Sequence, residues 1–267
     1  MVAIPALLHR LVKLTLSAIV AGVDWCGGRW PAKGTNRQNC GVVLYYHAVP
    51  RALRAAFAQQ MAWIADQAAP WSLSEPLLRV PFWVGISFDD AYVSVLEYAL
   101  PELEERGLPC TVFVPTGSLG QRPTWIRSPG HPLGREQVMS AEQVQMIAQI
   151  PGVQLGSHTV SHPDLTRVPK TVAERELRDS KERLEDLIGK VVELLSFPHG
   201  KWTPELVELS LAIGYRRLFG IQPTCLRGHR LPRVIGRVSV EPSDWPMEFF
   251  LKLHGCYRWQ AYVRLHL

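Results

Sequence analysis

Short runs of β-branched and aliphatic residues alternate with longer amphipathic segments from residue 41 onward. Seven of these runs predict strands, because each is brief, apolar and bounded by turn residues. The runs begin at Gly41, Val84, Cys110, Val153, Val191, Arg216 and Val234. A repeated order of strand and helix favours parallel strands with helices packed outside them. We therefore predict the α/β class and a closed or nearly closed β/α barrel.

The amphipathic segments carry separate signals for where helices start and stop. Ser140 and Gln143 form a capping-box pattern ahead of one helix. Pro204 stands at the first position of another helix, which Gly214 is predicted to end. Pro101 predicts a kink in the helix that follows the second strand. Helices are thus expected where a β/α alternation requires them.

Residues 1–40 are predicted to be separate from a barrel domain at 41–267. The start of the chain is apolar but contains His9, Arg10 and Lys13, and its longest uncharged run is half of the ~20 residues that span a bilayer. Three interpretations stay open: a secretory signal without a convincing cleavage site, an amphipathic helix in peripheral contact with a membrane, and a packed helix. A turn-rich linker follows. A cytoplasmic or membrane-peripheral location is favoured, with export still open.

Composition narrows the classes of partner and of site. The chain has 29 Lys and Arg against 24 Asp and Glu, a net charge of +5, which favours mild attraction to anionic surfaces. No basic run is interleaved with aromatic residues, so we predict no nucleic-acid partner. The five cysteines are odd in number and form no CxxC pair, which argues for reduced thiols over disulfides or a cysteine zinc site.

Side chains that bind metals or move protons follow three of the predicted strands. Asp89 and Asp90 end the second strand, His158 and His162 follow the fourth, and His47 follows the first. Functional groups of β/α barrels gather at this end of the strands. One carboxylate and two imidazoles suit a divalent catalytic ion, and the other carboxylate stays free as a base. For the two acids alone, capping of the next helix is the simpler alternative.

These segments resemble motifs of the polysaccharide deacetylase family, also called the NodB-homology or carbohydrate esterase family four domain. SFDDAY resembles its TFDDG motif, SHTVSHPDL resembles H(S/T)xxHP, and SFPHGKW occupies the place of RxPYG. YYHAV and LPRVIGRVSVEPSDWP resemble one bacterial branch of the family. The motifs occur in family order over about three quarters of the chain.

The resemblance implies a distorted (β/α)7-type barrel that holds a divalent metal ion, usually zinc. Carried over, Asp90, His158 and His162 are the metal ligands and Asp89 is the catalytic base. The implied reaction removes N-acetyl groups from a sugar of a bacterial polysaccharide, glycolipid or cell-wall glycan. Two alternatives stay open: hydrolysis of a non-sugar amide, and a catalytically silent glycan-binding or membrane-associated barrel.

The third motif and the first strand add further candidates. His199 stands where relatives carry Tyr, so its backbone N–H is expected to face the oxyanion, and its side chain is a candidate proton donor. Trp202 is expected either to stack on a sugar ring or to be an ordinary packed residue. His47 is a candidate for substrate binding.

Several positions depart from the family pattern. Ala91 replaces the Gly of TFDDG, a change we expect to be minor because a helix start needs no glycine-like backbone. Ser196 replaces an Arg that orients the base in relatives, and Arg233 or Arg237 is expected to supply that cation. Arg237 is also counted among the substrate-binding candidates. His254 is a candidate for the late general acid, although its surroundings predict a helix and relatives carry this residue on a strand.

Overall fold

Parallel strands form the centre of the computed structural model, which describes residues 4–28, 30, 40–128, 130–228 and 230–262. Along the main sheet the strand order is β10-β1-β3-β4-β5-β6-β7-β9, and every neighbouring pair is parallel. The strands are β1 (Cys40–Tyr46), β3 (Phe82–Phe88), β4 (Cys110–Val114), β5 (Val153–Ser157), β6 (Leu194–Ser196), β7 (Arg217–Phe219), β9 (Val234–Ile235) and β10 (Val238–Ser239).

The two ends of this sheet are neighbours in the sequence. β9 pairs with β7 and β10 pairs with β1, and only Gly236 and Arg237 separate the two strands. One late segment therefore meets both edges of the sheet, which curls into the predicted distorted (β/α)7-type barrel. All seven predicted strands are present, the last of them divided in two. Two short strands went unpredicted, β2 (Ala69–Trp71) beside β3 and β8 (Leu226–Arg227) antiparallel to β1, because runs of two or three residues show no periodicity.

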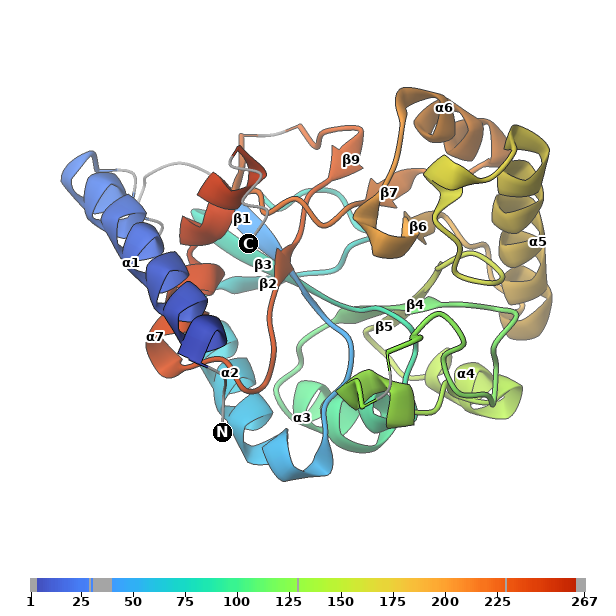
Figure 1. Cartoon of the computed structure of the whole chain (residues 1–267), viewed down its shortest axis with the longest axis horizontal. Helices are drawn as coiled ribbons and strands as arrows, with labels where there is room; N and C mark the ends of the chain where they lie inside the picture. Colours follow the sequence, from blue (N-terminus) through green and yellow to red (C-terminus); the bar gives the residue numbers. More distant parts are fainter. Residues whose placement is uncertain (1–3, 29, 31–39, 129, 229, 263–267) are drawn as a thin grey trace.

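Helices surround the strands (Figure 1). The α-helices are α1 (Ile4–Cys26), α2 (Arg54–Gln67), α3 (Leu100–Glu105), α4 (Ala141–Ile147), α5 (Lys170–Ile188), α6 (Pro204–Ile213) and α7 (Pro246–Leu253). Short 3-10 helices are η1 (Arg51–Leu53), η3 (Pro132–Arg135), η4 (Leu165–Arg167), η5 (Pro198–Gly200) and η6 (Cys256–Ala261). The capping box at Ser140 and the left-handed Gly214 after α6 are confirmed. The irregularity predicted at Pro101 takes the form of a π-helical turn, η2 (Val95–Ala99), directly before α3.

Side chains of the central strands β1, β3, β4, β6 and β7 divide between two cores. In β3, Val84 and Ile86 belong to the large cluster beneath the helices, whereas Trp83 belongs to a smaller cluster. Ser87 also faces inward, where it bonds the Arg237 side chain. The smaller cluster consists of Val43, Trp71, Leu73, Trp83, Phe113, Leu194, Phe219, Leu226 and Ile235. Because side chains alternate along a strand, Asp89, the first residue after β3, points inward like Trp83 and Ser87.

The helix α1 packs along α7 and η6 at the edge of the molecule (Figure 1). Trp259 donates a hydrogen bond of 2.9 Å from Nε1 to Ser17 Oγ, which links α1 to η6. None of the helices in the described ranges combines the length and apolarity needed to cross a bilayer. Most of the predicted linker, residues 31–39, lies outside the described residues.

Gly41 is expected to be essential for the packing of β1 on β3. A Cβ atom at this position would lie 2.3 Å from the backbone oxygen of Trp83, which has no room to move. We expect Gly41→Ala to lower the free energy of unfolding by ~1–3 kcal/mol in urea denaturation. The control is Gly22→Ala in α1, where no heavy atom lies within 4 Å, and where alanine's helix propensity predicts a gain of up to ~1 kcal/mol. Equal stability of the Gly41→Ala protein and the wild type would contradict this account.

Candidate metal and catalytic site

A cavity of about 460 Å³ lies at the carboxyl ends of the parallel strands. Its lining includes His47 after β1, Asp89 and Asp90 after β3, His158 after β5, and His199 after β6. His162 and a wall formed by residues 125–128, 131 and 133 also line the cavity. Residues far apart in the sequence are therefore collected in one cavity, as the strand-end argument predicted.

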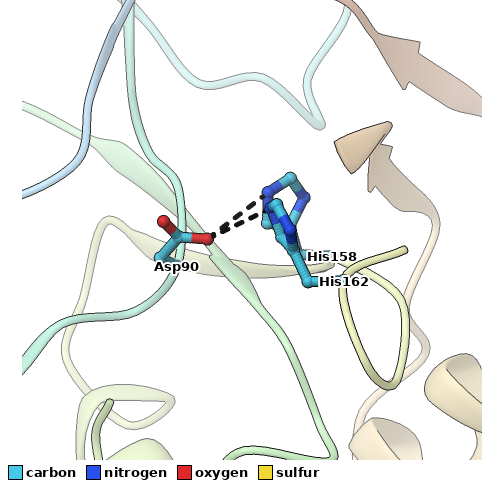
Figure 2. A group of neighbouring side chains, drawn as sticks. All are labelled: Asp90, His158 and His162. Atoms are coloured by element: carbon cyan, nitrogen blue, oxygen red, sulfur yellow. Dashed lines mark ion pairs between the residues drawn. The ribbon is translucent and has the colours of Figure 1, made fainter. Parts of the chain in front are cut away.

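Asp90 and the two histidines of the HxxxH motif form a compact group (Figure 2). The Oδ1 atom of Asp90 lies 3.7 Å from Nε2 of His158 and 3.5 Å from Nε2 of His162. One nitrogen or oxygen of each residue lies within 4.8 Å of the others, and all three residues are buried. The two imidazole rings stand nearly edge to face, with an interplanar angle of 70°. Three potential ligand atoms thus converge on one point.

Left-handed backbone positions concentrate at this group. Outside glycine, the described residues with positive φ are Asp90, Ala91, Thr159, His162 and His199. All of them belong to the three motifs, where strained backbone re-aims side chains that follow a strand or a turn. The expectation that Ala91 needs no glycine-like backbone is wrong, because its φ is 48°.

The imidazoles are arranged as neutral donors of lone pairs. Nδ1 of His158 lies 2.8 Å from the carbonyl oxygen of Ser196. Since a carbonyl only accepts, Nδ1 carries the proton and Nε2 presents its lone pair toward Asp90. Burial lowers the pKa of His158 to about 4 and, together with the neighbouring imidazoles, that of His162 to about 2. Both rings are therefore uncharged near neutral pH.

Asp90 is the residue whose surroundings most clearly fit a cation. Its Oδ1 is buried and has no hydrogen-bond partner among the described residues. Burial, and then the charge of Asp89, raise its pKa to about 7. A buried carboxylate oxygen without a donor is costly, and a divalent ion would satisfy it and favour its charged form. One oxygen and two nitrogens, with further positions left open, suit a catalytic divalent metal.

Asp89 has the opposite environment, because it forms a buried ion pair with Arg237. The guanidinium donates from Nη1 to Oδ1 at 2.7 Å and from Nη2 to Oδ2 at 2.8 Å. Its remaining hydrogen bonds go to Ser87 Oγ, Ser196 Oγ and the carbonyl oxygen of Gly220. Burial alone would raise the pKa of Asp89, but the Arg237 charge outweighs it and holds that pKa well below its usual range. Asp89 is thus ionised beside the Asp90 group.

Arg237, and not Arg233, supplies the cation that the third motif lacks. Ser196, in the place of the family Arg, accepts a hydrogen bond of 2.7 Å from Arg237 Nη2. Arg233 lies on the surface and pairs with Glu208. Arg237 is fully buried and is absent from the cavity lining. Arg237 therefore contacts Asp89 and not the space open to a substrate, contrary to the expectation that it binds substrate.

Two other candidates lie away from the cavity lining. Trp202 follows the third motif with 38% of its surface exposed, but it is not among the lining residues. His254 ends α7, and its ring stacks on Trp30 and Phe82 at centroid distances of 4.7 and 5.3 Å. This position among aromatic rings removes His254 from the candidates for the general acid.

Two aromatic residues at the site were missed in the sequence. Trp125 stacks on the His162 ring at 4.5 Å with an interplanar angle of 21°, and it fixes the orientation of that ring. Tyr45 contacts His47 edge to face and lies 4.7 Å from the Arg237 guanidinium carbon. Trp125 lies in a proline-rich loop, where no hydrophobic periodicity predicts which side chains face the cavity. The one sign in the sequence that it could belong to the site was an aromatic residue standing alone in such a loop.

The Arg237–Asp89 pair is expected to govern stability and its pH dependence. Arg237→Met leaves a buried carboxyl without its cation, so we expect the free energy of unfolding to fall by ~3–5 kcal/mol at pH 7 in chemical denaturation.

The pH dependence of stability should also change. In the wild type, the folded pKa of Asp89 lies below the unfolded value of ~3.9, so this stabilisation is present above that value and is lost as the pH falls through the folded pKa. In Arg237→Met, burial raises the pKa, so stability is lost as the pH rises instead.

The matched control for this prediction is Arg233→Met, which removes an exposed ion pair. Exposed pairs contribute little, so the control is expected to unfold like the wild type with an unchanged pH profile. If Arg237→Met and Arg233→Met changed the free energy of unfolding equally, the buried pair would contribute no more to stability than the exposed pair.

Ala91→Gly is expected to stabilise the protein. Glycine adopts a φ of 48° without the steric cost that alanine bears, which predicts a gain of ~0.5–1 kcal/mol in the free energy of unfolding. The control Ala62→Gly lies inside α2, where the same change is expected to cost up to ~1 kcal/mol. A loss of stability in Ala91→Gly would mean that residue 91 is not left-handed in solution.

Comparisons with known proteins agree with this fold. YxkH of Bacillus subtilis (strain 168), whose name assigns it provisionally to the polysaccharide deacetylases, is 23% identical over 214 residues, or 75% of this chain and 71% of YxkH. The deacetylase PplD of Streptococcus pyogenes, solved in complex with acetate, has a TM-score of 0.64 at 20% identity and covers 81% of this chain and 99% of PplD. IcaB of Ammonifex degensii has a TM-score of 0.66 at 22% identity, with coverages of 81% and 98%. The sequence model described as polysaccharide deacetylase matches residues 81–218, more than half of the chain. The chain belongs to the polysaccharide deacetylase family.

Proposed function

We propose that this protein is a metal-dependent hydrolase that removes the acetyl group from an N-acetylated sugar of a glycan. The observation that carries the proposal is the pairing of two adjacent carboxyls with opposite environments in one cavity. Asp89 is held ionised by Arg237, while Asp90 joins two neutral imidazoles in a buried group without a charge partner. Carboxyls set apart in this way are typical of sites that separate two chemical tasks.

Asp90, His158 and His162 would hold the divalent ion, for which zinc is our first choice. Two imidazole nitrogens and one carboxylate oxygen are a frequent donor set of catalytic zinc sites. When bound, the ion lowers the pKa of water and polarises the acetamide carbonyl. The Ser196 carbonyl oxygen holds His158 in the required tautomer, and the Trp125 ring restricts His162.

Asp89 is proposed as the general base. Its low pKa keeps the carboxylate free to accept a proton over the whole physiological range. The two parallel hydrogen bonds from Arg237 fix the plane of the carboxylate, so it cannot rotate toward Asp90. Positioning of this kind supports proton transfer from the attacking water to a defined oxygen.

His199 is proposed to act on the other side of the reacting carbonyl. It lines the cavity, and its ring lies 4.7 Å from the ring of His162. Partial burial lowers the pKa of the ring, so its imidazolium form gives up a proton more readily than that of a free histidine. The backbone N–H of His199 is proposed to stabilise the oxyanion, and the side chain, in its imidazolium form, to protonate the leaving amine and return to the neutral form.

The substrate-binding proposals concern His47 and Trp202. His47 lines the cavity beside Tyr45, and burial lowers its pKa, so it is expected to donate a neutral hydrogen bond to a sugar hydroxyl. Trp202 lies outside the cavity but is three residues from His199 and partly exposed. It is proposed to stack on a sugar ring next to the one that is deacetylated.

Asp89→Asn separates the proposed base from the proposed metal site. We expect acetate release from chitooligosaccharides to fall by roughly 10²–10⁴-fold, because the amide cannot accept the proton. Zinc binding in equilibrium dialysis should persist, whereas His158→Ala and His162→Ala should lose it.

The control for loss of fold is Arg233→Met, which should retain both zinc binding and turnover. Full acetate release by Asp89→Asn would remove Asp89 from the mechanism. A wild-type chain that binds no zinc or other divalent ion would overturn the proposal as a whole. Turnover of simple acetamides with none of chitooligosaccharides would instead favour a non-sugar amide as the substrate.

A further inference from the structure

The polar and apolar faces of α1 are placed the opposite way from those of an ordinary surface helix in water. Three of its polar residues, Arg10, Ser17 and Asp24, follow one another at intervals of seven, so they share one face. That face points toward the body of the protein, where Ser17 and Asp24 are buried. A helix on a soluble protein normally buries its apolar face and exposes its charges.

The inward face of α1 is held by polar contacts. The Arg10 side chain donates to Glu248 of α7 at 2.7 Å and lies 4.2 Å over the ring of Trp245. Asp24 Oδ2 lies 2.7 Å from the guanidinium of Arg258 in η6. Together with the Trp259–Ser17 hydrogen bond, these contacts fix the rotation of the helix about its axis. The outward face therefore cannot turn inward without breaking a buried ion pair.

Over the described side chains, from Leu7 to Cys26, the outward face of α1 is apolar apart from Thr15. Every exposed residue between Leu7 and Cys26 is uncharged. Its large exposed side chains are Leu7, Leu8, Leu11, Val12, Leu16, Ile19, Val23 and Trp25. Of the thirteen large exposed apolar side chains in the described ranges, these are eight, and Met247 and Tyr262 lie on or directly after the two elements that α1 packs against. Such a concentration marks an interaction surface, whereas isolated exposed apolar residues do not.

We propose that the outward face of α1 docks onto the surface of a lipid bilayer, with the helix axis parallel to the membrane. The helix lies at the edge of the molecule (Figure 1), so its outward face forms a convex ridge, and a bilayer receives such a ridge without a complementary groove. The helix does not meet the requirements of a membrane span, and its inward contacts keep the barrel outside the membrane.

Hydrogen bonding and charge on α1 favour lipid over a protein partner. Thr15, the one hydroxyl on the exposed face, donates to the carbonyl oxygen of Leu11 at 3.0 Å, so no donor remains to be satisfied by a partner. The single acidic residue of the helix, Asp24, is buried. Lys13 is partly buried and forms no ion pair within the described part of the chain, which leaves its charge for an anionic headgroup. Trp25, 70% exposed near the end of the helix, suits the headgroup level.

Vesicle flotation of the full chain tests this proposal. The chain should float with vesicles of phosphatidylglycerol and phosphatidylethanolamine, and less strongly with phosphatidylcholine, because its net charge is +5. Ile19→Glu should weaken binding about tenfold or more, since it places a charge in the centre of the apolar face. The matched control is Met146→Glu on α4, because Ile19 and Met146 are both 58% exposed. Binding of the control should equal that of the wild type.

A second measurement reports the orientation of the helix. Brominated lipids should quench Trp25, and the quenching should shrink in Trp25→Phe. Failure to float with either vesicle, or equal binding by Ile19→Glu and Met146→Glu, would overturn the proposal. So would a dimer in sedimentation velocity that Ile19→Glu dissociates and vesicles do not compete with, because the face would then belong to a second copy. Acetate release from soluble chitooligosaccharides should be the same in Ile19→Glu and in the wild type, which separates this test from that of the proposed activity.

Discussion

The ion pair of Arg237 and Asp89 links the closure of the barrel to the chemistry of the cavity. Arg237 occupies the two-residue gap between β9 and β10, where the two edges of the sheet meet. Asp89 is the first residue after β3. A buried guanidinium is tolerable when its donors are satisfied, and here Asp89, two serine hydroxyls and the Gly220 carbonyl oxygen accept all of the hydrogen bonds that it forms. The same contact therefore joins the sheet edges and holds the carboxylate.

Adjacent carboxyls acquire different properties because the backbone turns between them. Asp89 continues the inward alternation of β3 and reaches Arg237, whereas Asp90 has a φ of 70° and points at His158 and His162. The pKa of Asp89 falls below its usual range, and that of Asp90 rises to about 7. Left-handed residues recur in the other two motifs, at Thr159, His162 and His199. The strain is tolerated because well-packed strands on all sides hold these turns in place.

The molecule presents two distinct surfaces for two kinds of contact. The cavity is concave and collects polar side chains from the ends of four strands, which suits a small polar group of a glycan. The α1 ridge is convex and apolar, and its polar side faces the protein. Because α1 packs chiefly against α7 and η6, whereas the cavity lies at the ends of β1, β3, β5 and β6, changes to the ridge and changes to the cavity are expected to act independently.

Features that depend on contacts between residues close in the sequence could be predicted, whereas features that depend on contacts between distant residues could not. The seven strands, the capping box at Ser140 and the left-handed Gly214 depend on contacts within a few residues, so periodicity and helix signals predicted them. That Asp89, Asp90, His158 and His162 share one cavity was predictable because their motifs follow strand ends. The choice of Arg237 over Arg233, the left-handed Ala91 and the stacking of Trp125 on His162 depend on groups brought together across the barrel. The composition of α1 left three interpretations open, and only its packing against α7 decided which face is buried, because an amphipathic pattern does not state which side the protein covers.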